Sequence, residues 1–171
     1  MPETEVIIRS EAGGDAGAIT EVTEAAFRDL EISNQTEHFI VEALRRAGAL
    51  ALSLVAETGG RVVGHVAFSP VTISDGTGEW YGLGPVSVLP EYQGRGVGSA
   101  LIERGLSELR DLGARGCVLV GFPDYYIRFG FRHFPGLVHE GVPPDAFMAL
   151  PFNEEVPSGR VTFHRGFQAK E

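Results

Sequence analysis

The strongest constraint in this sequence is a glycine-rich loop that follows one expected strand and precedes one expected helix. Its residues run Val86-Ser87-Val88-Leu89-Pro90-Glu91-Tyr92-Gln93-Gly94-Arg95-Gly96-Val97-Gly98-Ser99. Glycine at alternate positions lets the backbone approach a ligand closely, and a helix N-terminus carries roughly half a positive charge. A pyrophosphate would fit against such amides, and Arg95 adds a cation that can make bidentate contacts with phosphate.

Two other nucleotide-binding loops fit this segment poorly. A Walker loop ends in Gly-Lys-Ser/Thr, but the only lysine of the chain is Lys170, which excludes that motif. A dinucleotide-binding loop needs a third glycine where this chain has Ser99, and it should follow the first strand of a βαβ repeat. A glycine-rich turn that leads into an amphipathic helix and binds no ligand remains the alternative.

Apolar periodicity predicts an ordered series of strands and helices around this loop. Pro85 lies inside the third strand of an expected antiparallel meander and cannot donate a ladder hydrogen bond, so that strand should be bulged or splayed around residues 82–85. No linker or repeat divides the sequence, which predicts a single domain over residues 1–171. Strands are expected over residues 6–10, 52–57, 61–73, 80–89, 117–120, 146–152 and 161–164, and helices over 15–27, 34–47, 96–112 and 125–129.

The charge balance argues against two classes of partner. The chain has 14 Lys and Arg against 23 Asp and Glu, a formal net charge of −9, which disfavours phosphate backbones and favours cationic substrates such as amines. No stretch supplies the roughly 18 uncharged apolar residues of a membrane helix. We therefore expect no nucleic-acid and no membrane partner. The single cysteine, Cys117, indicates a cytoplasmic protein without an internal disulfide.

The loop and a second motif resemble one enzyme family. The segment from Gln93 to Gly98 matches the Gln/Arg-x-x-Gly-x-Gly/Ala pyrophosphate motif of the GNAT superfamily of acetyl-CoA-dependent N-acetyltransferases. A second signature of that family has a tyrosine four residues before a Gly-Phe pair, as Tyr126 stands before Gly130 and Phe131. The order of elements over residues 6–163 is also similar. The paired tyrosines and residues 146–150 most resemble bacterial acetyltransferases of the YhbS type.

The resemblance implies a fold and a donor substrate. The fold is α/β (α+β), with a mixed, mostly antiparallel sheet that splays between its fourth and fifth strands and has helices on both faces. The donor is acetyl-CoA, and no metal is implied. The pantetheine arm would pair with the backbone of the splayed strand, and the loop amides would hold the pyrophosphate. The implied cofactor-binding residues are Val86, Ser87, Val88, Gln93, Gly94, Arg95, Gly96, Val97, Gly98 and Ser99.

The implied reaction moves an acetyl group to a primary amine by direct attack, without a covalent acyl-enzyme. Tyr126 is then the candidate catalytic residue that donates a proton to the departing thiolate, because an ordinary phenol is protonated at neutral pH. Tyr125 is its competitor, because adjacent residues on a short helix face about 100° apart and only one can reach the sulfur. A purely packing role for both aromatic rings is the other interpretation.

The sequence leaves the general base and the acceptor site open. Glu79 stands at the start of the splayed strand, but a solvated strand-end residue is the more frequent case. Acidic residues around the first two helices could attract a cationic amine or form a solvated face. The histidines have no metal-site spacing, so structural or surface roles are expected for them. The acidic residues are Glu24, Asp29, Glu31 and Glu37, and the histidines are His38, His65, His133, His139 and His164.

Two further expectations concern partners and an alternative function. The acceptor would be a small-molecule or peptide amine, and a homodimer could form through a C-terminal strand pair that carries Phe152, Phe163 and Phe167. A catalytically inactive module that keeps the CoA-binding loop as a sensor is the alternative from a different functional class. Retention of Tyr126 favours the enzyme, and the absence of an obvious base favours the module.

Overall fold

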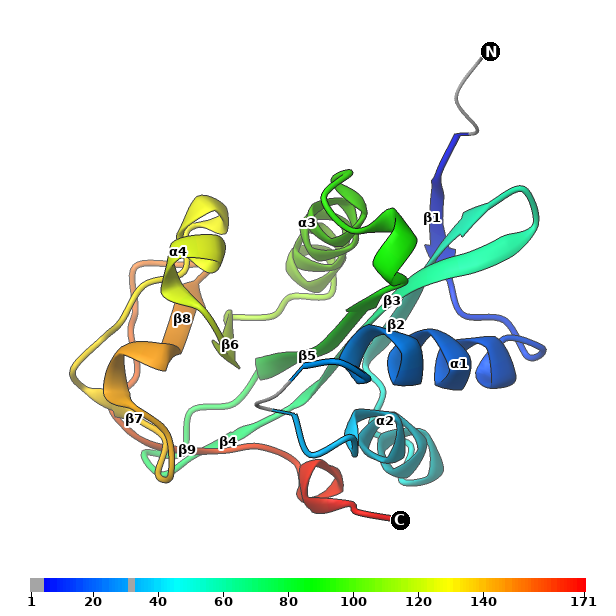
Figure 1. Ribbon diagram of the computed structural model, residues 1–171. Coiled ribbons are helices and arrows are strands. Elements are labelled where there is room, and N and C mark those ends of the chain that lie inside the picture. Colours follow the sequence, from blue (N-terminus) through cyan, green and yellow to red (C-terminus); the bar gives the residue numbers. More distant parts are fainter. Residues whose placement is uncertain (1–4, 31–32) are drawn as a thin grey trace.

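The computed structural model, which describes residues 5–30 and 33–171, is built on a six-stranded sheet (Figure 1). The strand order is β1-β2-β3-β5-β6-β8. Neighbouring strands run antiparallel except for the parallel pair β5–β6, which confirms the mixed, mostly antiparallel sheet. The strands are β1 (Ile7–Ser10), β2 (Leu52–Thr58), β3 (Arg61–Pro70), β5 (Trp80–Val88), β6 (Gly116–Val120) and β8 (Phe147–Pro151).

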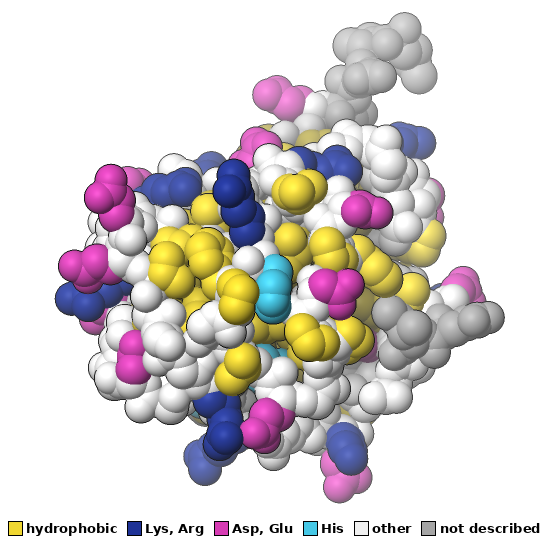
Figure 2. Space-filling view, turned by 90° about the vertical axis from the view of Figure 1, so that its left-hand side faces the viewer, with side chains coloured by type: hydrophobic (Ala, Val, Ile, Leu, Met, Phe, Trp, Pro, Cys, Tyr) yellow, Lys and Arg dark blue, Asp and Glu magenta, His cyan; other side chains and the backbone are white. Residues whose placement is uncertain are grey.

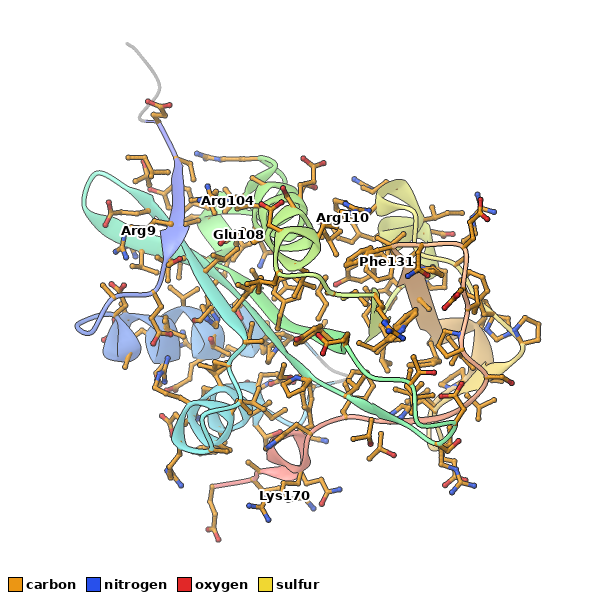
Figure 3. All side chains as sticks on the ribbon, turned by 180° about the vertical axis from the view of Figure 1, so that it is seen from behind. Arg9, Arg104, Glu108, Arg110, Phe131 and Lys170 are labelled. Atoms are coloured by element: carbon orange, nitrogen blue, oxygen red, sulfur yellow. The ribbon has the colours of Figure 1, made fainter. Side chains whose placement is uncertain are left out.

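Helices cover both faces of this sheet, as expected (Figure 1). Helices α1 (Ala16–Phe27) and α2 (Glu37–Arg46) pack on one face, and α3 (Val97–Asp111) packs on the other, with α4 (Pro123–Tyr126) on the same side as α3. The outer side of α3 carries an exposed ion pair between Arg104 and Glu108, 2.8 Å apart (Figure 3). No helix in the described part of the chain is both long enough and apolar enough to cross a bilayer.

A second, smaller sheet has the order β4-β9-β7. It consists of β4 (Thr72–Ile73), β9 (Gly159–Thr162) and β7 (Leu137–Val138). The strand expected over residues 61–73 therefore divides into β3 and β4, which belong to different sheets. The two C-terminal strands also separate, because β8 pairs with β6 whereas β9 pairs with β4 and β7. The two C-terminal strands therefore do not form a pair with each other, and a homodimer through Phe152, Phe163 and Phe167 stays a prediction.

The fourth and fifth strands of the main sheet, β5 and β6, pair only at their first residues. Trp80, Tyr81 and Gly82 lie opposite residues 116–118, and beyond them β5 pairs with β3 alone and β6 with β8 alone. The register between β3 and β5 shifts at one point, because Leu83 pairs with Phe68 and Val86 pairs with Val66. The chain advances three residues along β5 over this stretch but only two along β3. This bulge spans Pro85, so the predicted splay and its position are both confirmed.

Helix α3 lies close to the sheet because one of its residues has no side chain. A Cβ atom added at Gly105 would lie 2.2 Å from the ring of Phe68, which is fully buried. We expect Gly105→Ala to lower the free energy of unfolding by about 1–3 kcal/mol, because the overpacked ring cannot move aside. Urea unfolding of the purified variant measures this change.

Gly17→Ala is the matched control, since Gly17 lies in α1 and an added Cβ would meet no atom within 4 Å. Because alanine has a better helix propensity than glycine, Gly17→Ala should leave the free energy of unfolding unchanged or raise it by up to about 1 kcal/mol. Equal effects of the two alanines would contradict the close approach of α3 to the sheet.

Candidate active site

The glycine loop presents a row of unengaged backbone amides at the start of α3. A short turn, η1 (Pro90–Tyr92), leads into it, and Gly94 and Gly96 have φ values of 76° and 84°. Only glycine adopts this left-handed region readily, which explains the alternate glycines. Within the described residues, the amides of residues 94–99 donate no hydrogen bond. A Cβ at Gly94 or Gly96 would meet no atom within 4 Å, so the space beside them is open.

The polar side chains of the loop take different roles. Gln93 donates from Nε2 to the backbone carbonyl of Val88 at 2.9 Å, so its side chain ties the loop to the end of β5. Arg95 is exposed and lies 5.4 Å from the ring centroid of Tyr92. Val97 is buried, and its side chain lies against the position of Gly64 on β3. Only the backbone of Val97 is therefore available to a ligand, whereas the Arg95 guanidinium is free to approach one.

Within the described part of the chain, one edge of β5 has no strand beside it after Gly82. Leu89 donates its N–H to Val63 of β3 at 2.9 Å, and the carbonyl of Val88 accepts from Gln93 instead. Because successive residues of a strand direct their backbone groups to opposite sides, the N–H and C=O groups of Val86 and Val88 point away from β3, toward the gap. The Ser87 hydroxyl is buried and has no partner in the described part of the chain.

A cavity of about 1120 Å³ adjoins this edge. It is bounded by α1 and α2, the bulge of β5, the end of β6 with α4, and segments from the last third of the chain. On the face that carries α4, β7 and β8, hydrophobic side chains gather around histidine side chains (Figure 2). The lining residues are Phe27, Leu30, Glu37, Ile40, Leu83, Gly84, Pro85, Val86, Val120, Gly121, Phe122, Pro123, Tyr126, His139, Val142, Pro143, Asp145, Ala146, Thr162, Phe163, His164, Phe167 and Gln168.

The two adjacent tyrosines lie at different places. Tyr126 lines the cavity, and its ring packs so closely on Gly121 that a Cβ there would lie 2.5 Å away. Burial, with a smaller contribution from Tyr125, raises the pKa of Tyr126 to about 12, so its hydroxyl stays protonated at neutral pH. The Tyr125 hydroxyl instead lies 3.3 Å from Oγ of Ser99, in the first turn of α3. Arg128 covers the Tyr125 ring at 4.5 Å.

Of the acidic residues that the sequence offers as candidates, only some line the cavity. Glu37 lines it, and Oγ of Ser33 donates to the Glu37 carboxylate at 2.7 Å. Glu24 and Asp29 are not among its lining residues, and Glu31 lies outside the described residues. Glu79 is exposed at the beginning of β5, away from the cavity. Of these carboxylates, Glu37 is therefore the one placed to meet an amine there.

Sequence reasoning missed the contribution of the C-terminal third. His65 is fully buried with Nε2 2.8 Å from Oγ of Ser53, which fits a structural role. His139 and His164, which were expected to have structural or surface roles, line the cavity together with Asp145. Their spacing carries no signal, because long-range pairing of short strands brings them together. No group of three or more His, Cys, Asp or Glu side chains within the described ranges could hold a metal ion.

Comparisons with known proteins agree with this geometry. Residues 19–131 match the model of the Acetyltransferase (GNAT) family. The protein named uncharacterized N-acetyltransferase YhbS of Escherichia coli K12 is 36% identical over 128 residues, which cover 74% of this chain and 74% of that protein.

Two solved structures share the whole architecture. A GNAT family acetyltransferase from Brucella melitensis, in complex with acetyl-CoA, is 51% identical with a TM-score of 0.86, over 96% of this chain and 99% of that one. The Escherichia coli YhbS structure, in complex with CoA, is 31% identical with a TM-score of 0.87, over 98% and 94% of the two chains. The glycine loop, the parted sheet and these matches show that the chain belongs to the GNAT acetyltransferase family.

Proposed function

We propose that this protein transfers an acetyl group from acetyl-CoA to a primary amine by direct attack of the amine on the thioester. The observation that carries the proposal is the row of unengaged amides over residues 94–99, beside a strand edge that borders the cavity. The Brucella melitensis relative holds acetyl-CoA and the Escherichia coli relative holds CoA. An inactive CoA-binding module gains no support from these relatives.

The donor would span the parted sheet. Its pyrophosphate accepts hydrogen bonds from the amides of residues 94–99, assisted by the charge of the α3 N-terminus and by Arg95. The pantetheine amides pair with the free backbone groups of Val86 and with the N–H of Val88. The Val88 N–H is then placed to stabilise negative charge on the thioester oxygen as a tetrahedral intermediate forms.

Direct attack agrees with the environment of the single cysteine. Cys117 is fully buried in β6, and burial raises the pKa of its thiol, so it is no nucleophile for an acyl-enzyme. Tyr126 is the proposed donor to the CoA thiolate, because it lines the cavity and keeps its proton at neutral pH. Tyr125 lies over the first turn of α3 instead.

The cavity supports a class of acceptor. Its walls are mainly aliphatic and aromatic, with the carboxylates of Glu37 and Asp145 among the lining residues. An ammonium group attached to an apolar body, whether a small molecule or a peptide, suits such a site. Many of the residues that line the cavity lie beyond residues 19–131, the range that matches the family model. We therefore propose that the whole chain, 1–171, acts as one N-acetyltransferase domain.

Gly96→Glu tests the pyrophosphate site. The new side chain places bulk and a negative charge beside the loop amides, so we expect acetyl-CoA affinity to fall by at least about 100-fold. Isothermal titration calorimetry measures the affinity. Gly113→Glu is the control, because Gly113 has the same left-handed backbone, with φ of 86° against 84°, at the opposite end of α3. If both variants bind acetyl-CoA like wild type, the loop is not the pyrophosphate site.

Tyr126→Phe tests the proton donor. Removing the hydroxyl should lower the turnover number by about 100-fold while acetyl-CoA affinity stays the same. The assay follows thiol release from acetyl-CoA in the presence of 2-phenylethylamine, an amine with an apolar body. Tyr125→Phe is the paired variant and should retain most of the turnover number. The reverse result would make Tyr125 the donor.

A further inference from the structure

Two histidines that line the cavity use Nδ1 in opposite ways: one donates a hydrogen bond from this atom, and the other accepts one at it. Nδ1 of His139 lies 2.9 Å from the backbone carbonyl of Val161. A carbonyl oxygen only accepts, so Nδ1 carries the hydrogen, and Nε2 of the neutral ring carries the lone pair. Nδ1 of His164 accepts from the N–H of Gly166 at 3.0 Å, so its Nε2 carries the hydrogen. His139 therefore offers a base to the cavity, and His164 offers a donor.

The His139 ring is held in place on several sides. It meets Phe163 edge-on, with centroids 4.8 Å apart, and Phe147 at 5.5 Å. The side chain is half-buried. Within the described part of the chain, its Nε2 makes no hydrogen bond and is not a buried atom. A ring fixed through Nδ1, with an accessible Nε2 at the cavity, has the geometry that a general base requires.

We propose that His139 is the general base that deprotonates the acceptor amine, an inference that rests on the proposed function. Nε2 accepts one proton from the ammonium group and later releases it to solvent. The amine nitrogen forms a bond to the thioester carbonyl carbon, and the carbon–sulfur bond breaks with its electron pair on sulfur. Tyr126 gives its hydroxyl proton to the thiolate, and the second proton of the ammonium group replaces it through solvent. One ammonium and one thioester thus become an amide, a thiol and one proton.

The other titratable groups of the cavity do not compete for this role. A carboxylate is in general a far weaker base than an imidazole, and the carboxylates of Glu37 and Asp145 favour a cation nearby. Tyr126 is protonated, and His164 presents an N–H. Outside the cavity, Glu140 next to His139 pairs with Arg160 of β9 at 3.1 Å, on exposed side chains. Among the described residues that line the cavity, His139 is the one whose hydrogen bonding leaves an imidazole lone pair free.

The tautomers are measurable without any acceptor. Long-range proton–nitrogen NMR spectra of the histidine-labelled protein above pH 7.5, assigned with His139→Gln and His164→Gln, should show Nδ1–H for His139 and Nε2–H for His164. An Nε2–H tautomer at His139 overturns the inference whatever the acceptor is.

The kinetic test uses kcat/KM for 2-phenylethylamine as a function of pH. His139→Asn keeps an amide donor in the place of Nδ1 for the Val161 carbonyl and removes Nε2, and we expect it to lower kcat/KM at neutral pH by at least about 100-fold. The remaining rate should rise with pH toward the pKa of the amine, because only neutral amine then reacts. With 2,2-difluoro-2-phenylethylamine, whose fluorines lower the amine pKa, the loss should be much smaller. His133→Gln is the control, since His133 is exposed and does not line the cavity.

The outcomes separate this inference from the function on which it rests. If the wild type turns over but the pH profile of kcat/KM for His139→Asn runs parallel to the wild-type profile, with equal losses for both amines, the role of His139 alone is overturned. Acetyl-CoA binding without turnover of any amine in a broad panel overturns the proposed function and the base together.

Discussion

The structure depends on a place where two strands stop pairing. Backbone N–H and C=O groups that lack partners cost free energy. Where β6 has diverged, the backbone groups of Val86 and the N–H of Val88 have no strand partner among the described residues. The glycine loop and the first turn of α3 add the amides of residues 94–99, which donate no hydrogen bond there. A nucleotide with a diphosphate and an amide-bearing arm would satisfy both sets at once. We therefore propose that the local deficit of hydrogen bonds makes this part of the sheet the binding site for a CoA thioester.

Packing holds this opening in position. At the beginning of β5 and β6, a Cβ at Gly116 would lie 2.4 Å from the ring of Trp80, so the two strands lie close there before the bulge at Pro85 separates them. Gly105 against Phe68 seats α3 on the sheet and with it the loop. The small sheet then holds the C-terminal segments that complete the cavity proposed for the acceptor.

The features encoded by local pattern could be predicted from the sequence, and those made by distant contacts could not. Alternate glycines and Pro85 predict the loop and the splay, because glycine permits a left-handed backbone and proline lacks the N–H that a strand ladder needs. The second sheet joins two-residue strands such as Leu137–Val138 to residues far along the chain, and such short strands have no periodicity to detect. His139 and His164 reach the cavity through that pairing, so their roles become visible only in three dimensions.

Binding of CoA through the backbone amides of the parted sheet and the loop can be followed residue by residue. Nitrogen-15-labelled protein is titrated with CoA, and the amide chemical shifts are recorded. We predict that the largest changes fall on residues 94–99 and on Val86 and Val88. Saturable binding that leaves these amides unchanged, with shifts confined to other parts of the sheet, would contradict it.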